Sequence, residues 1–210
     1  MLTAFTAGLL LITLSELGDK TFFIAVILSI RYSRKLVFIG VTLALAVMTI
    51  LSVFVGQIIS ILPRIYLHYA EIILFFSFGI KLLYDASKMS TSSNKEEEKE
   101  AAEAVEKSKS KFPKLSSSLG IILEAFFLTF TAEWGDRTQI ATIALAATYQ
   151  PLGVVLGATL GHAICTAIAV VGGRLIAGKI SERMITAIGG CLFILFGLVA
   201  IWKGVGTDAI

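Results

Sequence analysis

The chain consists of long apolar runs joined by short polar turns, and one extended polar segment separates these runs into two groups of three. Each run is long enough for a membrane span, since about 20 consecutive apolar residues cross the hydrocarbon core of a bilayer as a helix. The pattern predicts six transmembrane helices, at residues 2–30, 36–60, 69–86, 119–147, 152–177 and 184–203. We therefore expect an all-α integral membrane protein.

Composition agrees with this pattern and excludes several classes of protein. Hydrophobic residues make up 56% of the 210 residues, and the mean hydropathy of +0.87 is far above that of a soluble domain. Six spans leave no room for a soluble catalytic domain, so we expect neither an enzyme nor a resident cofactor. The net charge of +3 comes from short loops beside the spans, which does not indicate nucleic-acid binding. The lipid bilayer is the expected partner, and a homo-oligomer is compatible with the sequence.

The chain carries one six-residue pattern twice. Residues 16–21 read Glu-Leu-Gly-Asp-Lys-Thr, and residues 133–138 read Glu-Trp-Gly-Asp-Arg-Thr. A shift of 117 positions, without a gap, superimposes the two motifs. The same shift pairs identical residues in the flanking runs, namely Tyr32 with Tyr149, Gly40 with Gly157 and Thr49 with Thr166. Apolar composition alone would not keep these residues in register, so the sequence indicates an internal duplication.

The duplication predicts a first three-span repeat at residues 1–86, a charged linker at 87–118 and a second three-span repeat at 119–210. Because each repeat has an odd number of spans, the second enters the membrane from the opposite side, which makes an inverted repeat. The linker is rich in charge and poor in aromatic residues, which predicts a flexible segment or at most a solvated helix. A regulatory or cation-collecting role is the alternative for this linker.

The loop charges predict the orientation. Positive residues gather after the first, third and fifth spans, at Arg31, Arg34, Lys35, Lys88 through Lys114, Lys179 and Arg183. The positive-inside rule places these loops in the cytoplasm and both termini on the other side, in periplasm or lumen. No positively charged region precedes the first apolar run, so we expect a membrane span there rather than a signal peptide.

Each motif places ionisable side chains in the middle of an apolar run, where a charge costs about 2.5–3.5 kcal/mol on insertion scales. On a helix, Glu16 and Asp19 share one face, and so do Glu133 and Asp136. Inverted insertion would bring the four carboxylates together near the bilayer midplane, with further oxygens from Thr21, Thr138 and Gln139. Hard divalent cations such as Ca²⁺ and Mn²⁺ bind ligands of this kind. Helix pairing by salt bridges alone is the alternative.

The charge balance of the motifs indicates ion exchange. Lys20 and Arg137 follow Glu16 and Glu133 by four residues, the favourable order for a helical ion pair. Four acids and two bases leave a formal charge of −2, which one divalent cation neutralises. When the cation leaves, protons would take its place, because a low-dielectric site favours the neutral carboxyl.

Other polar residues give weaker signals. Gly18 and Gly135 lie between the carboxylates, where glycine weakens a helix and releases backbone carbonyls, although close helix packing is the alternative. Glu124 is a candidate for an access path or, equally, an interface glutamate. His162 has no equivalent in the first repeat and favours a buried packing role over a proton relay.

The motifs resemble the E-x-G-D-(K/R)-(T/S) signature of a family of cation/proton antiporters that includes Golgi, chloroplast and cyanobacterial manganese/calcium transporters. Both signatures are intact, and the resemblance covers nearly the whole chain. It implies export of Mn²⁺, Ca²⁺ or both from the cytoplasm in exchange for protons. It also implies a ligand set in the two motifs: Glu16, Asp19, Glu133 and Asp136, with contributions from Thr21, Thr138 and Gln139.

The resemblance further implies a bacterial chain, in the plasma membrane or a cyanobacterial thylakoid membrane. Two other functions stay open at this stage. An exporter of cationic amino acids or other organic cations would need a roomier, aromatic-lined site. A membrane assembly factor would use the same charges only to join helices.

Overall fold

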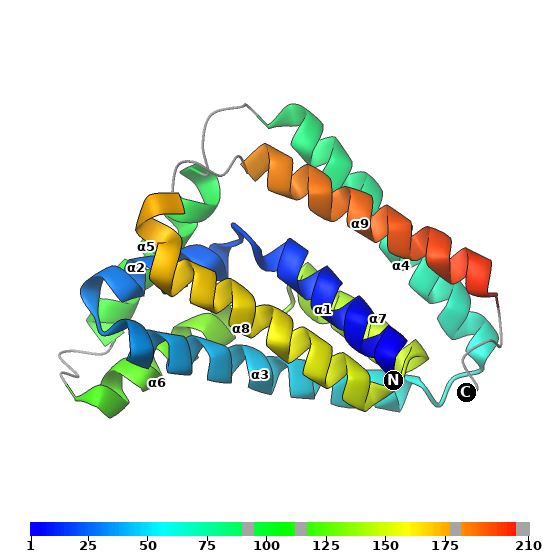
Figure 1. Cartoon of the computed structure of the whole chain (residues 1–210), viewed down its shortest axis with the longest axis horizontal. Helices are drawn as coiled ribbons and strands as arrows, with labels where there is room; N and C mark the ends of the chain where they lie inside the picture. Colours follow the sequence, from blue (N-terminus) through cyan, green and yellow to red (C-terminus); the bar gives the residue numbers. More distant parts are fainter. Residues whose placement is uncertain (90–94, 112–116, 177–181, 205–210) are drawn as a thin grey trace.

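The structure, a computed structural model, describes residues 1–89, 95–111, 117–176 and 182–204 (Figure 1). In these ranges every regular element is a helix, as expected. The helices are α1 (Leu2–Glu16), α2 (Lys20–Arg31), α3 (Arg34–Ile59), α4 (Arg64–Lys88), α5 (Lys95–Lys111), α6 (Ser118–Ala132), α7 (Arg137–Thr148), α8 (Pro151–Ile176) and α9 (Glu182–Lys203). Among the described residues, four stretches are long and apolar enough to cross a membrane: Arg34–Ile59, Arg64–Lys88, Pro151–Gly172 and Arg183–Lys203.

The first and fourth predicted spans are each broken in the middle, at the glycines where the sequence predicted a weakened helix, and neither span is one continuous helix. The first becomes α1 and α2, and the fourth becomes α6 and α7. Gly18 and Gly135 lie in the breaks with φ of 79° and 85°. This left-handed conformation cannot continue a right-handed helix, and it is accessible to glycine at little steric cost.

The two halves of the chain are interlocked. In the centre α3 packs against α8, while α1 lies along α8 and α6 and α7 lie along α3 (Figure 1). α4 pairs with α9, and this pair also packs against α1 and α7. One apolar cluster includes Phe23 and Val41, and a second includes Phe75, Leu145 and Phe193. Most of the tight contacts therefore join a helix of one half to a helix of the other.

The two ends of the molecule differ. At one end lie the N-terminus, the α3–α4 turn and the α7–α8 turn, and at the other lie the α2–α3 turn, α5 and the start of α6 (Figure 1). The α4–α9 pair approaches the other helices at the first end and diverges from them towards the second (Figure 1). The molecule is thus wedge-shaped, and its wide end carries α5.

Part of the predicted linker is an ordered helix. Ala101 and Val105, four residues apart on α5, are fully buried in the apolar cluster that contains α2. Lys20 Nζ lies 3.2 Å from Glu100 Oε2, and Arg31 pairs with Glu106 at 3.8 Å. Residues 95–111 therefore form a helix that contacts the rest of the molecule through a short apolar stripe. Residues 90–94 and 112–116 of the linker lie outside the described residues.

Small residues allow α1 and α8 to approach closely. Gly153, Gly157 and Gly161 form a stripe on α8 that faces the backbone of α1. A Cβ on Gly153 would lie 2.7 Å from Met1 O, and one on Gly157 would overlap Phe5 O. This stripe therefore sets the spacing of the two helices.

We expect Gly157→Ala to lower the thermal unfolding midpoint of the purified protein by several degrees, because overpacking costs about 1–3 kcal/mol. Gly189→Ala is the matched control, since its Cβ would meet only Leu82 Cδ1 at 3.9 Å. Equal midpoints for the two variants would show that the α1–α8 contact does not limit stability.

Candidate functional site

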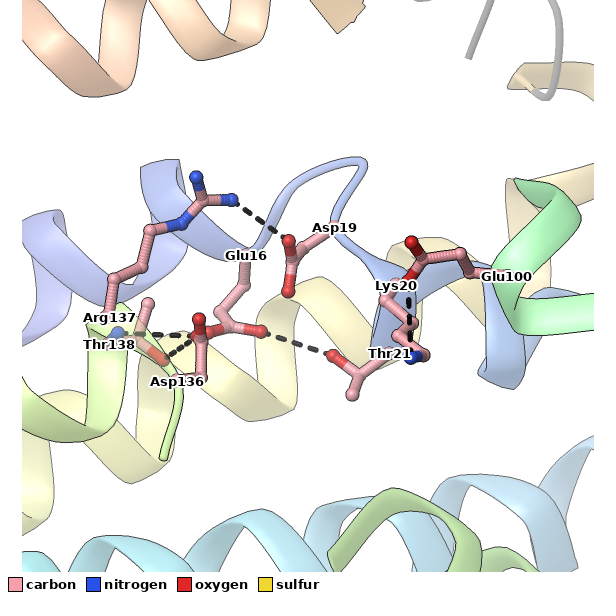
Figure 2. Close-up of polar contacts among 8 residues, drawn as sticks. All are labelled: Glu16, Asp19, Lys20, Thr21, Glu100, Asp136, Arg137 and Thr138. Carbon is pink, nitrogen blue, oxygen red and sulfur yellow. Dashed lines mark hydrogen bonds and ion pairs between the residues drawn. The ribbon is translucent and has the colours of Figure 1, made fainter. Parts of the chain in front are cut away.

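The two breaks meet inside the molecule. Glu16 is the last residue of α1 and Asp19 directly precedes α2, while Glu133 directly follows α6 and Asp136 directly precedes α7. Carboxylate oxygens of Glu16, Asp19 and Glu133 all lie within 4.8 Å of one another. Figure 2 shows that Glu16 and Asp136 point towards each other from the two motifs. The structure therefore brings together the acidic side chains that the sequence separates by 117 residues.

The acidic residues of each motif do not share a helical face, which corrects the sequence-based argument. α1 ends at Glu16, and the turn at Gly18 places Asp19 outside both helices. The same break separates Glu133 from Asp136. The positive φ of Gly18 and Gly135 interrupts the helix between the two acids of each motif, whereas a continuous helix would have held them at fixed spacing.

The basic residues form different ion pairs from those predicted. Arg137 Nη2 donates to Asp19 Oδ1 at 2.9 Å, which joins the second motif to the first, and Lys20 pairs with Glu100 on α5 (Figure 2). The expected helical pair of Glu16 with Lys20 is not formed, because it requires an unbroken helical turn and the turn is broken at Gly18.

The hydroxyl and amide groups hold the breaks in place. Thr21 Oγ1 donates to Glu16 Oε2 at 3.2 Å. The backbone N–H and the hydroxyl of Thr138 both donate to Asp136 Oδ2, at 3.2 and 2.8 Å, which is an N-terminal cap of α7. Gln139 Oε1 accepts from the backbone N–H of Gly135 at 2.7 Å. Three predicted site residues therefore orient the break or its carboxylates, and their role as ion ligands stays a prediction.

The two glutamates are the most deeply buried acids of the site. Glu16 is 2% exposed and Glu133 is 3% exposed. The Oε1 atom of each has no hydrogen-bond partner among the described residues. Buried carboxylates without partners are costly, so this site favours any arrangement that supplies positive charge or protons.

Each glutamate faces a small cavity of about 10 Å³, which is room for about one water molecule. The Glu133 cavity is lined by Glu133, Thr138, Thr49, Leu45 and His162, among others. The Glu16 cavity is lined by the residues that stand 117 positions away from these, Glu16, Thr21, Thr166, His162 and Leu45. The two cavities are therefore equivalent under the sequence repeat, and Leu45 and His162 border both.

Two larger cavities connect the site with the wide end of the molecule. One of about 150 Å³ lies between the first break and the facing ends of α4 and α9, where it reaches Asp19, Arg137, Asp85 and Ile185. The other, of about 430 Å³, also reaches Asp19 and Arg137 and is bordered by Glu100 of α5. Neither cavity is lined by Glu16 or Glu133.

Glu124 and His162 are two further buried polar residues of the second half. Glu124 is buried on α6, where its carboxylate faces Tyr32, and its predicted place on an access path stays a prediction. The sequence favoured a packing role for His162 because it is a lone histidine on an apolar span, with a proton relay as the alternative, and did not predict that it would border both small cavities. The signal that would have found it is the 117-residue register, which places His162 over Leu45 on the helix facing the opposite motif.

The chain is similar to known proteins over nearly its full length. The family model for the divalent cation/proton antiporter GDT1 matches residues 4–90 and 121–208. A GDT1-like protein of Synechocystis sp. is 57% identical over 202 residues, which cover 96% of this chain and 98% of that protein. GDT1-like protein 4 of Oryza sativa subsp. indica is 47% identical over 201 residues, covering 93% of this chain and 72% of its own. No solved structure matches the chain in this comparison.

We expect Gly135→Ala to destabilise the protein by about 1–2 kcal/mol, because alanine must adopt the left-handed conformation. A Cβ at Gly135 would meet no atom within 4 Å, so crowding does not contribute to this cost. Gly135→Asn should lose less stability, since asparagine tolerates this conformation better. Thermal unfolding of the three proteins measures the difference. A Gly135→Ala protein as stable as the parent would contradict the description of the break.

Proposed function

Because the chain belongs to the GDT1 family of divalent cation/proton antiporters, we propose that it exports Mn²⁺ or Ca²⁺ from the cytoplasm in exchange for protons. The observation that carries this proposal is the convergence of carboxylate oxygens of Glu16, Asp19 and Glu133 within 4.8 Å. Oxygen ligands at this spacing suit a hard divalent cation. Asp136, Thr21, Thr138 and Gln139 are the proposed supporting ligands.

Competition for the carboxylates would couple the two ions. Asp19 is already paired with Arg137, whereas Glu16 and Glu133 each keep one buried oxygen without a hydrogen bond among the described residues. A divalent cation bound between them removes their mutual repulsion. Once the cation leaves, protons do the same, so the site holds either the metal or protons. An exchanger requires that the metal ion and the protons do not occupy the site at the same time.

The proposed architecture is a pair of inverted three-helix repeats, at residues 1–86 and 119–210, joined by the linker at 87–118. In this division, each repeat contains one broken span and two continuous ones. Three observations support it: both breaks occur at the same motif position, the family model matches two segments, and the two small cavities are equivalent under a shift of 117 residues.

The proposed orientation places the wide end of the molecule in the cytoplasm and both termini on the other side. The α2–α3 turn and the start of α9 lie at the wide end (Figure 1). Arg31, Arg34 and Arg183 belong to these segments, in agreement with the positive-inside rule. The two larger cavities then connect Asp19 with the cytoplasm. In this arrangement the protein faces inward, and movement of the α4–α9 pair towards α2 and α6 would close the site on that side.

The small cavities beside Glu16 and Glu133 each have room for about one water molecule, which suits a metal ion at these two glutamates. The cavity of about 430 Å³ that reaches Asp19 is large enough for an organic cation, so cavity size alone does not separate the two substrates. Membership in an antiporter family argues against a role restricted to membrane assembly.

We expect MnCl₂ and CaCl₂ to raise the unfolding midpoint of the purified protein, because a ligand that binds only the folded state stabilises it. KCl at equal ionic strength should not. In proteoliposomes, Mn²⁺ should drive a proton flux. The Glu16→Gln, Glu133→Gln double variant should lose both effects, since it cannot neutralise a divalent cation.

The matched control for this experiment is Glu103→Gln on α5, which removes the same charge at an exposed position. Full metal-driven flux in the double variant would eliminate the carboxylate site. An equal loss in the control would show that the effect comes from net charge alone.

The orientation is testable with single cysteines in a background in which Cys165 and Cys191 are replaced by alanine. We expect a membrane-impermeant maleimide to label Leu62→Cys, in the α3–α4 turn, in intact cells. Ser33→Cys, between α2 and α3, should react only after permeabilisation. The opposite labelling pattern would reverse the proposed direction of transport.

A further inference from the structure

The basic residues of the two motifs stand at equivalent positions but make different ion pairs. A shift of 117 residues places Lys20 on Arg137. Arg137 Nη2 lies 2.9 Å from Asp19 Oδ1, so this arginine pairs with the opposite motif. The residue equivalent to Asp19 is Asp136, but no ion pair joins Lys20 to it in the described part of the chain. Instead, Lys20 Nζ lies 3.2 Å from Glu100 Oε2 on α5 (Figure 2). The symmetry of the two motifs is therefore broken at Lys20.

Lys20 borders the same cavity as the carboxylate with which it does not pair. The cavity of about 430 Å³ at the wide end is lined in part by Lys20, Glu100 and Asp136. Lysine carries its charge on a flexible four-carbon chain, so its ammonium group can turn from one carboxylate to another across a shared cavity. Glu100 and Asp136 are therefore alternative partners for Lys20.

The docking of α5 decides between these two partners. Ala101 directly follows Glu100 and is fully buried, and Val105, one turn later, is buried in the same apolar cluster. These two residues place the Glu100 carboxylate beside Lys20. The side chains of Lys20 and Glu100 are 32% and 56% exposed, and exposed ion pairs contribute little to stability. The pair therefore fixes the position of the lysine more than it stabilises the fold.

We propose that Glu100 is a positioning residue for the cation site, because it holds Lys20 away from Asp136 and so keeps one positive charge out of the two motifs. This inference rests on the proposed transport of a divalent cation at the motif carboxylates. With Lys20 held by α5, Arg137 is the one motif base that pairs with a motif acid in the described structure. Release of Lys20 to Asp136 neutralises a second acid.

The position of Lys20 changes how strongly the site attracts its ion. Coulomb attraction of a divalent cation grows with the net negative charge around it, and it is strong where little water screens the charges. The site with Lys20 on Glu100 is one unit more negative than the site with Lys20 on Asp136. The linker helix thereby raises the affinity of the two motifs for a divalent cation, although α5 belongs to neither repeat.

The experiment measures the half-saturating MnCl₂ concentration for Mn²⁺-driven proton flux in proteoliposomes of the full chain. Glu100→Gln should raise this concentration at least about fivefold, because the released Lys20 neutralises one carboxylate of the site. The maximal flux should stay within about twofold of the parent, since every motif residue is still present. Stabilisation of the purified protein against heat should also require more MnCl₂ in the variant, which measures binding without transport.

Glu103→Gln is the matched control, because Glu103 is exposed on the same helix and its replacement changes the net charge equally. Its half-saturating concentration should equal that of the parent. Glu100→Asp keeps the negative charge and should remain closer to the parent than Glu100→Gln. In a Lys20→Gln background, Glu100→Gln should have no further effect, since no lysine is left to release.

Each outcome decides the proposal. An unchanged half-saturating concentration in Glu100→Gln overturns it, and so does an equal rise in Glu103→Gln, which would indicate an effect of net charge. A rise of the same size in the Lys20→Gln background would show that Glu100 attracts the cation directly, which also overturns the positioning role. Absence of both Mn²⁺-driven flux and stabilisation by MnCl₂ in the parent would overturn the proposed function, and this inference with it.

Discussion

Carboxylates enclosed by apolar helices repel one another, and the surrounding structure is arranged around that repulsion. Asp19 is neutralised by Arg137 from the other motif, and Asp136 accepts two hydrogen bonds from Thr138. Glu16 and Glu133 receive less compensation and are the more deeply buried pair. The protein therefore compensates only part of the negative charge of the site. In the proposed function, a bound cation or protons compensate the rest.

The ends of the broken helices also place partial charges beside the acidic groups. Both α2 and α7 begin at the site, so the partial positive charge of each helix N-terminus lies beside the acidic groups. Both α1 and α6 end there, and helix C-termini leave backbone carbonyl oxygens without partners inside the helix. One glycine per motif thus supplies donors for carboxylates and acceptors for a cation at the same depth. Unbroken helices would present neither.

The sequence predicted the parts of this arrangement that depend on composition and register. Hydrophobic run length gave the helical class, and the 117-residue shift identified both motifs. The sequence did not predict the ion pairs. Pairing of Glu16 with Lys20, four residues apart on a helix, fails because Gly18 breaks the turn. Sequence patterns also missed the docking of α5, whose two buried residues, Ala101 and Val105, are a weak signal in a charged segment. The sequence also did not predict the position of His162, because a single histidine on an apolar span gives no sign of which side chains it will lie beside in the fold.

The interlocked packing of the halves has a consequence for how the chain is made. α1 lies along α8 and α3 along α6 and α7, so the first half is synthesised before the helices that cover it exist. Until then Glu16 and Asp19 are without Arg137 and without the other acidic motif. The nascent first half must therefore keep its polar break shielded within the insertion machinery or at the membrane surface while about 100 further residues are translated, a delay of roughly 5–20 s at typical synthesis rates.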